Sequence, residues 1–426
     1  MLARSVAFNL AGQFGSLAVG FVASVVLARL LGPADRGLLA LMISVADLTF
    51  VLAGLGVPLA VMFFASRAQP QTAALLGNSL AYGAGLALLL VPAFYLLREP
   101  LADAVARGEG GSTWALVAAI VSLNFLNWTT RNQLVGALRF GLSNVLVVGS
   151  KTATLLGVLI LVGVLDWGVA GGLVATGLGS LLSIVASLSV LLRHARPRLD
   201  AGLFRGLLRY GVRVQAGALF STVNTRLDVL VLQAFRPLAQ VGYYVVAQVV
   251  AELVIVLARA FQGSVLPLVA REEGRGDTTA LALRHHSLLA AIAVVLNAGF
   301  GTLVILVAYG DAFRPALEPM LILLPAMWFL GTGNVIASDL GGRGRPGTSS
   351  ALAALAAGLT LALDLILIPP YGVTGAAIAS VCAYAVYGVA SIVVLSRIAG
   401  IPVRQLVVPT AADLRAYRRL LRRRRS

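Results

Sequence analysis

The chain has 426 residues, of which 59% are hydrophobic and 12% are charged, and its mean hydropathy is +0.92. Soluble domains carry about 25% charged residues, so this composition excludes an ordinary soluble protein and indicates an integral membrane protein. The formal net charge is +16, and the single cysteine, Cys382, excludes a disulfide within the chain.

Apolar segments of about 20 residues follow one another along the chain, and each can cross roughly 30 Å of hydrocarbon as a helix. The first is too long for the apolar region of a signal peptide and is expected to remain as a membrane helix. The sequence predicts an all-α integral membrane protein with about twelve transmembrane helices, at residues 6–30, 38–63, 72–97, 114–138, 144–165, 167–192, 211–234, 241–268, 285–309, 315–338, 348–369 and 371–396.

The second half of the chain echoes the first. Residues 167–176 are WGVAGGLVAT and residues 371–380 are YGVTGAAIAS, an offset of 204. At an offset of 205, Gly37 pairs with Gly242 and Asp47 with Glu252. We therefore expect a tandem duplication that gives two six-helix bundles in parallel orientation. The predicted parts are an N-lobe over 1–192, a basic cytoplasmic linker over 193–210, a C-lobe over 211–396 and a basic cytoplasmic tail over 397–426.

The arginines fix the expected orientation. If both termini are cytoplasmic, the inner loops and tail hold twenty-two arginines and the outer loops six, with Arg36 among the outer ones and Arg343 among the inner ones. This is the bias of the positive-inside rule, and it predicts a multi-pass protein of the bacterial cytoplasmic (inner) membrane. The tail is expected to lie on anionic membrane lipids, or else to dock a partner. The high net charge needs no nucleic-acid partner.

Ionisable residues inside predicted spans are costly and are candidates for function. In the fourth span Asn124, Asn127 and Arg131 are spaced i, i+3, i+7 and therefore share a helix face. Three other spans hold further candidates. The fifth has one lysine, Lys151, and the seventh has Arg226 and Asp228, which need partners on other helices. The eighth has Glu252 and Arg259 on one face.

Collected, these residues predict a hydrated cavity in which bases outnumber acids, which suits an anionic ligand. Arginine is well matched to phosphate because its planar fork donates two hydrogen bonds. The predicted substrate-binding residues are Arg131, Lys151, Arg226, Arg259, Asn124 and Asn127. The acids Asp47, Asp228 and Glu252 are expected either to couple transport to an ion or to pair structurally with bases. No catalytic or metal site is predicted.

Three further predictions concern residues outside this set. His285 and His286 lie beside an inner loop and are expected to be solvated. Asp364 lies near the outer end of its span and is expected to be wetted.

Four stretches carry a resemblance to a known family. They are NLAGQ…VVLARLLGPADRGLLAL within 9–41, NTRLDVLVL at 224–232, VGYYVVAQVVAEL at 241–253 and PPYGVTGAAIAS at 369–380. In this order and spacing they resemble the oligosaccharide flippases of polysaccharide biosynthesis. These belong to the multidrug/oligosaccharidyl-lipid/polysaccharide exporter superfamily.

The resemblance implies two six-helix bundles that form a V around a cavity open alternately to either side. It also implies a substrate, a polyprenyl-pyrophosphate-linked oligosaccharide moved from the cytoplasmic to the outer leaflet for cell-surface polysaccharide. Basic cavity residues would hold the pyrophosphate and sugar, and the polyprenyl tail would stay in lipid. The implied coupling ion is H⁺ or Na⁺, and the implied further partners are polysaccharide-assembly proteins.

Two alternatives stay open at this point. A drug/cation antiporter of the same superfamily would prefer an acidic, aromatic cavity. A membrane enzyme acting on the same lipid-linked glycan, such as a polymerase or ligase, would need an acid–base or metal constellation. The sequence shows no histidine–carboxylate cluster, no DxD motif and no large outer loop, so we expect no enzymatic activity and no cofactor besides a coupling ion.

Overall fold

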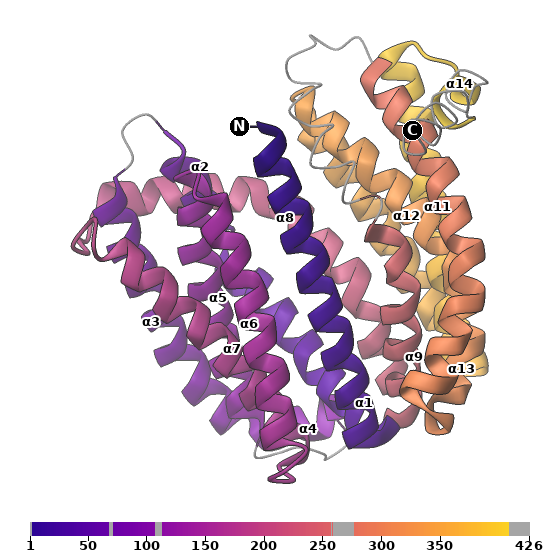
Figure 1. The fold of residues 1–426 in the computed structure, drawn as a ribbon, viewed down its shortest axis with the longest axis horizontal. Coiled ribbons are helices and arrows are strands. Elements are labelled where there is room, and N and C mark those ends of the chain that lie inside the picture. The colour runs from indigo at the N-terminus through magenta and orange to yellow at the C-terminus, as the bar shows by residue number, and fades with distance from the viewer. Residues whose placement is uncertain (1, 68–70, 107–112, 257, 259–276, 409–426) are drawn as a thin grey trace, which may run out of the picture. The chain divides into compact units, whose positions relative to one another are not determined.

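The computed structural model describes residues 2–67, 71–106, 113–256, 258 and 277–408. Within these ranges the chain is all-α, as predicted, and no strand occurs in them (Figure 1). The helices fall into two compact units, 1–246 and 247–426. The predicted division into two lobes, a linker and a tail is defined by the sequence repeat, whereas these two units are defined by contacts between residues. The units therefore do not test that division, which stays a prediction.

The first unit contains most of the longer helices. They are α1 (Leu2–Gly54), α2 (Val57–Ala65), α3 (Thr72–Leu96), α4 (Arg98–Ala106), α5 (Trp114–Gly136), α6 (Phe140–Leu161), α7 (Gly168–Leu191), α8 (Ala201–Phe235) and the start of α9 (Leu238–Ala251). The second unit holds the end of α9, then η2 (Glu252–Val254), α11 (Asp277–Leu303), the π-helical η3 (Val304–Tyr309), η4 (Asp311–Ala316), α12 (Leu317–Gly342), α13 (Pro346–Ala399) and α14 (Val403–Val407).

Within the described residues, seven helices are long and apolar enough to cross a membrane. Two of these, Phe14–Gly54 and Pro346–Ala399, have 41 and 54 residues and each covers two predicted spans. At 1.5 Å per residue even the shorter one is about 60 Å long, twice the hydrocarbon thickness. The three remaining predicted spans lie on α5, on α8 and, for the described part of the span 241–268, on the short apolar helix Leu238–Val254. Residues 257 and 259–268 of that span lie outside the described residues, and the predicted span 38–63 is divided between α1 and α2.

Both long helices bend where two predicted spans meet. In α1 the break is at Gly32 (φ 72°, ψ 177°), directly before Pro33, and in α13 it is at Gly372 (φ 58°, ψ −132°), two residues after the Pro369-Pro370 pair. Proline removes a helical N–H donor and glycine tolerates positive φ, so each pair turns the chain without a loop.

The repeated sequence has a repeated backbone conformation. Gly168 begins α7 with φ 52°, and Gly372, which lies 204 residues later in the matching motif, has φ 58°. Each glycine lies at the start of the helical segment that carries the rest of its motif. The echo in the sequence is therefore a structural repeat at this turn.

The second pair of repeated glycines lies at a helix crossing in the first unit. A Cβ atom on Gly37 of α1 would come within 2.0 Å of the Leu238 carbonyl oxygen, and one on Gly242 of α9 within 2.0 Å of the Pro33 carbonyl oxygen. At the offset of 205, Pro33 corresponds to Leu238 and Gly37 corresponds to Gly242. The contact of Gly37 with Leu238 is therefore equivalent to the contact of Gly242 with Pro33. The crossing has local pseudo-two-fold symmetry and needs glycine on both helices.

Each unit has its own apolar core. In the first unit α2, α3, α5 and α8 bury Val61, Leu75, Phe125 and Leu207. In the second unit α11, α12 and α13 bury Leu283, Val335, Ile336 and Leu395. Large apolar side chains such as Leu88 and Val295 remain exposed on the outside of the helices, which suits a surface covered by lipid.

Candidate functional site

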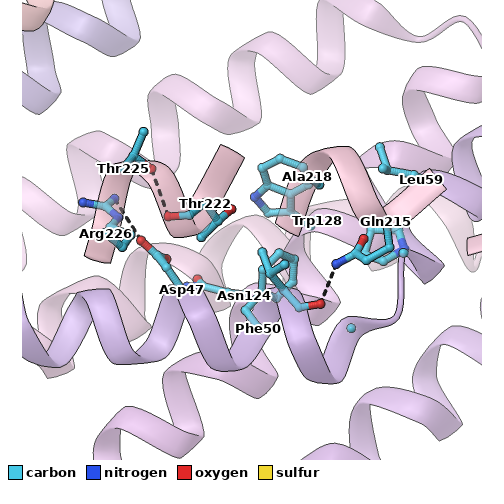
Figure 2. Close-up of a pocket in the computed structure, with 14 residues that line it drawn as sticks. Asp47, Phe50, Leu59, Asn124, Trp128, Gln215, Ala218, Thr222, Thr225 and Arg226 are labelled. Atoms are coloured by element: carbon cyan, nitrogen blue, oxygen red, sulfur yellow. Dashed lines mark hydrogen bonds and ion pairs between the residues drawn. The ribbon is translucent and has the colours of Figure 1, made fainter. Parts of the chain in front are cut away.

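A cavity of about 250 Å³ lies inside the first unit, against α1, α2, α5 and α8 (Figure 2). Its wall combines one acid, one base, two amides, two threonines and two large aromatic rings. These residues are Asp47, Arg226, Asn124, Gln215, Thr222, Thr225, Phe50 and Trp128. A mostly apolar wall with a few convergent polar groups is the usual composition of a ligand site.

An ion pair crosses one end of the cavity. A terminal guanidinium nitrogen of Arg226, on α8, lies 2.9 Å from Oδ2 of Asp47, on α1. The side chains are 36% and 30% exposed, so neither charge is sealed from solvent. Such partly solvated pairs contribute little to stability and open at low cost. The partner that Arg226 was expected to need on another helix is therefore Asp47.

Two more predicted bases lie near this pair without lining the cavity. Lys151 of α6 has an exposed side chain within electrostatic range of Asp47 and of Arg131. Arg131 of α5 is half-buried, and its buried Nε has no hydrogen-bond partner among the described residues. Two cations, Arg226 and Lys151, thus act on the Asp47 carboxylate, and Arg131 lies within range of Lys151, so cationic charge is in excess in this part of the first unit.

The predicted shared face of α5 is confirmed, but it lies against another helix. Ser180 Oγ donates to Asn124 Oδ1 at 3.0 Å and Ser183 Oγ donates to Asn127 Oδ1 at 2.7 Å, both from α7. Of the two amides only Asn124 lines the cavity, while Asn127 is buried.

The same spacing continues to a third position. Ser187 lies 56 residues after Arg131, as Ser180 and Ser183 lie after their asparagines. Ser187 is fully buried and its hydroxyl has no partner within the described residues. We call these three pairs, Asn124 with Ser180, Asn127 with Ser183 and Arg131 with Ser187, the ladder between α5 and α7. The first two pairs are hydrogen-bonded, and in the described part of the chain the Ser187 hydroxyl is not.

The other predicted acids are placed elsewhere. Asp228 of α8 is fully buried, and its carboxylate accepts hydrogen bonds from the Tyr244 hydroxyl and, at 2.9 Å, from the Val229 amide. Glu252 is half-buried in η2, in the second unit. Arg259 lies outside the described residues. The ion-coupling or structural role of Asp47, Asp228 and Glu252 stays a prediction, as does substrate binding by the bases and asparagines.

The prediction that Arg36 is an outer-loop charge is wrong. α1 resumes directly after the bend at Gly32, so no loop exists there, and Arg36 is only 7% exposed with its guanidinium 3.4 Å from Ser24 Oγ.

The solvation expected for His286 and Asp364 is also wrong, because both side chains are fully buried in the second unit. His286 packs against Gly331 of α12 within the first turns of α11, and Asp364 lies inside α13. Hydropathy located the ends of these spans but does not show which face of a helix packs against its neighbours.

One buried charge cluster was missed. Asp339 is fully buried in α12, accepts a hydrogen bond from Thr279 Oγ1 at 2.5 Å and forms an ion pair with Arg343 Nε at 2.6 Å. The i, i+4 spacing of Asp339 and Arg343 was the available signal. No group of three or more His, Cys, Asp or Glu residues in the described part of the chain could hold a metal ion.

A second cavity of the first unit, about 500 Å³, lies against α3 and the start of α8 and is more apolar. Its amide, Asn78, is already bonded to the Asp200 backbone through Nδ2 and Oδ1. Because its polar groups are committed in this way, the cavity of Asp47 and Arg226 is the better candidate for a site that recognises a polar ligand.

The model of the polysaccharide biosynthesis protein family matches residues 2–272. The chain belongs to this family. Among curated proteins, the chain is 26% identical over 203 residues to the uncharacterized membrane protein MJ1068 of Methanocaldococcus jannaschii, a match that covers 46% of the chain and 40% of that protein. It is 23% identical over 236 residues to the probable low-salt glycan biosynthesis flippase Agl15 of Haloferax volcanii, covering 51% and 50%. The matches thus span half of these relatives or less.

The fold also matches solved transporters. The lipid II flippase MurJ, in an inward closed conformation, has a TM-score of 0.76 at 16% identity, covering 93% of this chain and 88% of that one. A multidrug resistance MATE family transporter of the MOP superfamily, in an inward-facing conformation, has a TM-score of 0.65 at 17% identity, covering 93% and 95%. At such identities the matches show the fold alone, and this fold is the one predicted from the sequence.

Proposed function

We propose that the protein is a flippase that moves a polyprenyl-pyrophosphate-linked oligosaccharide from the cytoplasmic to the outer leaflet by alternating access. The observation that carries the proposal is the partly exposed pair of Arg226 and Asp47 at a cavity inside a membrane-embedded helix bundle. The family match and the names of the relatives, one a probable glycan biosynthesis flippase and one a lipid II flippase, support it.

The charges around the pair favour an anion. Arg226, Lys151 and Arg131 together carry two more positive charges than Asp47 can neutralise. A pyrophosphate brings several acceptor oxygens, and a guanidinium can bind two of them at once. Exchanging the Asp47 carboxylate for a phosphate on Arg226 would cost little, because the existing pair is partly solvated.

The same exchange offers a route to ion coupling. When Arg226 turns from Asp47 to a phosphate, the carboxylate loses its charge partner. A proton or Na⁺ taken up at Asp47 would replace that partner and stabilise the loaded state. In this proposal ion uptake and substrate binding are linked through one guanidinium.

One observation favours the antiporter alternative. Phe50, Trp128 and Asp47 give the cavity the aromatic and acidic groups that suit cationic drugs. Against this, the one acid of the wall is already paired with Arg226. Reconstitution distinguishes the two functions.

The test uses the full-length protein in liposomes that contain a lipid-linked oligosaccharide, with a glycosidase added outside. We expect the protected glycan of the inner leaflet to become cleavable over time and at a faster rate under an imposed ion gradient. Cation-driven drug efflux from the same liposomes without glycan exposure would overturn the flippase proposal in favour of an antiporter.

Variants test the residues. Arg226→Ala and Arg131→Ala should each abolish complementation of a flippase-null strain at unchanged expression, because each removes a cation of the proposed pyrophosphate site. Arg314→Gln, an exposed arginine of η4 in the second unit, is the matched control and should complement normally. Normal complementation by both alanine variants would remove the assignment.

A further inference from the structure

The cavity has an aromatic wall that pyrophosphate binding does not use. The rings of Trp128, on α5, and Phe50, on α1, both line it, with centroids 5.9 Å apart and planes tilted by 57°. Trp128 is 48% exposed, and no acceptor for its indole N–H occurs among the described residues.

Membrane-interface anchoring does not explain this tryptophan. Trp128 lies 14 residues into α5 and eight before its end, which is about 21 Å and 12 Å along the axis. Anchoring tryptophans lie at the headgroup level, close to the ends of a span. Trp128 instead exposes its ring within the span, beside polar groups of the cavity.

Two amides next to the rings are held in fixed orientations. Ser180 Oγ donates to Asn124 Oδ1 at 3.0 Å, which leaves the two Nδ2 hydrogens of Asn124 for the cavity. Gln215 Nε2 donates to the Val51 carbonyl oxygen at 2.5 Å, which leaves Oε1 of Gln215 as an acceptor (Figure 2). The wall therefore presents a donor from one helix and an acceptor from another.

The charges of the wall cancel. Arg226 and Asp47 are its base and its acid, and they are bonded to each other. The pair lies at one end of the cavity, and the wall around Trp128, Asn124 and Gln215 carries no formal charge, so that part suits an uncharged portion of the ligand. The excess cations Lys151 and Arg131 lie outside the lining.

We infer that this cavity is a carbohydrate subsite that takes one pyranose ring of the transported glycan. The carbon–hydrogen face of the ring packs on Trp128, and its hydroxyl groups bond to Asn124 and Gln215. The volume of about 250 Å³ is below the roughly 300–1,000 Å³ of sites for drug-sized ligands, so it limits occupancy to a single ring or little more. The identity of the sugar's carrier, though not the sugar site itself, rests on the proposed function.

Saturation-transfer NMR on the full-length protein in nanodiscs tests the subsite directly. The probes are free glucose, galactose, N-acetylglucosamine and rhamnose at millimolar concentration. At least one should receive saturation on its ring protons, with binding weakened about tenfold by Trp128→Ala and retained by Trp128→Phe. Absence of transfer to every probe, or equal transfer in Trp128→Ala, would overturn the inference.

Two variants separate the site from general damage. Trp167→Ala removes another exposed tryptophan, 52% exposed at the start of α7 and outside the cavity, and should leave binding unchanged. Ser180→Ala frees the Asn124 amide to turn and should weaken binding by less than Trp128→Ala does. Melting temperatures measured on the same samples identify a variant that has failed to fold. If Trp128→Ala fails to fold, the inference is tested by Trp128→Phe, which should retain binding, and by Ser180→Ala, which should weaken it.

The glycosidase assay distinguishes failure of the inference from failure of the proposed function. If the wild type exposes glycan and Trp128→Ala does so at the same rate, the subsite is refuted while the flippase stands. If the wild type exposes no glycan but binds free sugar through Trp128, the flippase is refuted while the subsite stands.

Discussion

Arg226 meets two conditions at once, because it is paired with Asp47 and it faces a cavity. As a partly solvated pair it should add little to stability, while as a cavity cation it should matter for an anionic substrate. Stability and transport should therefore respond very differently to its removal.

A double-mutant cycle measures this difference. Arg226→Gln, Asp47→Asn and the double variant should each change the free energy of unfolding by less than about 1 kcal/mol, because the pair is partly exposed. Glycan exposure in liposomes should be lost whenever Arg226 is replaced, including in the double variant. Recovery of transport in the double variant would show that the pair is structural and that Arg226 does not bind substrate.

At the same scale, the sequence identified which residues need partners but not the partners themselves. Asp228 was marked as a costly intramembrane acid, and the structure supplies the Tyr244 hydroxyl from α9. Sixteen residues separate the two, and no periodicity connects positions on different helices. The partner was set by how α8 and α9 lie against each other.

At the scale of the helices, the sequence repeat places equivalent glycines at the crossing of α1 and α9. Gly37 and Gly242 each face a carbonyl oxygen of the other helix, and the two contacts exchange under the 205-residue offset. An α-carbon without a side chain is required at both places because the backbones approach so closely.

Gly37→Ala should therefore lower the melting temperature and reduce transport, since its Cβ would lie 2.0 Å from the Leu238 carbonyl oxygen and the helices must separate. Gly20→Ala is the matched control on the same helix, because a Cβ there meets nothing within 4 Å. It should leave the protein unchanged or stabilise it by up to about 1 kcal/mol through helix propensity. Equal melting temperatures for the two variants would contradict the packing argument.

The ladder between α5 and α7 shows the limit of reasoning from one helix. The i, i+3, i+7 spacing correctly placed Asn124 and Asn127 on one face. It did not show that both asparagines bond to serines of α7, or that only Asn124 of the two lines the cavity. Periodicity fixes positions around a helix axis, while the rotation of the helix in the bundle decides what they face.

For the whole molecule, the apolar segments predict twelve spans and the arginine distribution predicts that both termini are cytoplasmic, and the lone Cys382 makes this orientation testable. In a Cys382→Ser background, a membrane-impermeant maleimide added to intact cells should label Leu165→Cys and Asp311→Cys, which lie in expected outer turns. It should label Arg193→Cys and Arg345→Cys only after the cells are opened. The reverse pattern, or mixed labelling of the two inner positions, would refute the orientation.

Local features of the sequence determined the membrane class, the helical spans and the repeat. Hydropathy, proline and glycine act over a few neighbouring residues, so the sequence displays them directly. Only the tertiary structure decided that Arg36 and His286 are buried, that Asp47 holds Arg226, and that Trp128 opens into a cavity. Those outcomes depend on how helices that are distant in the chain are rotated and cross one another. When one face of a helix packs against a neighbour, the opposite face is left for lipid or for a cavity.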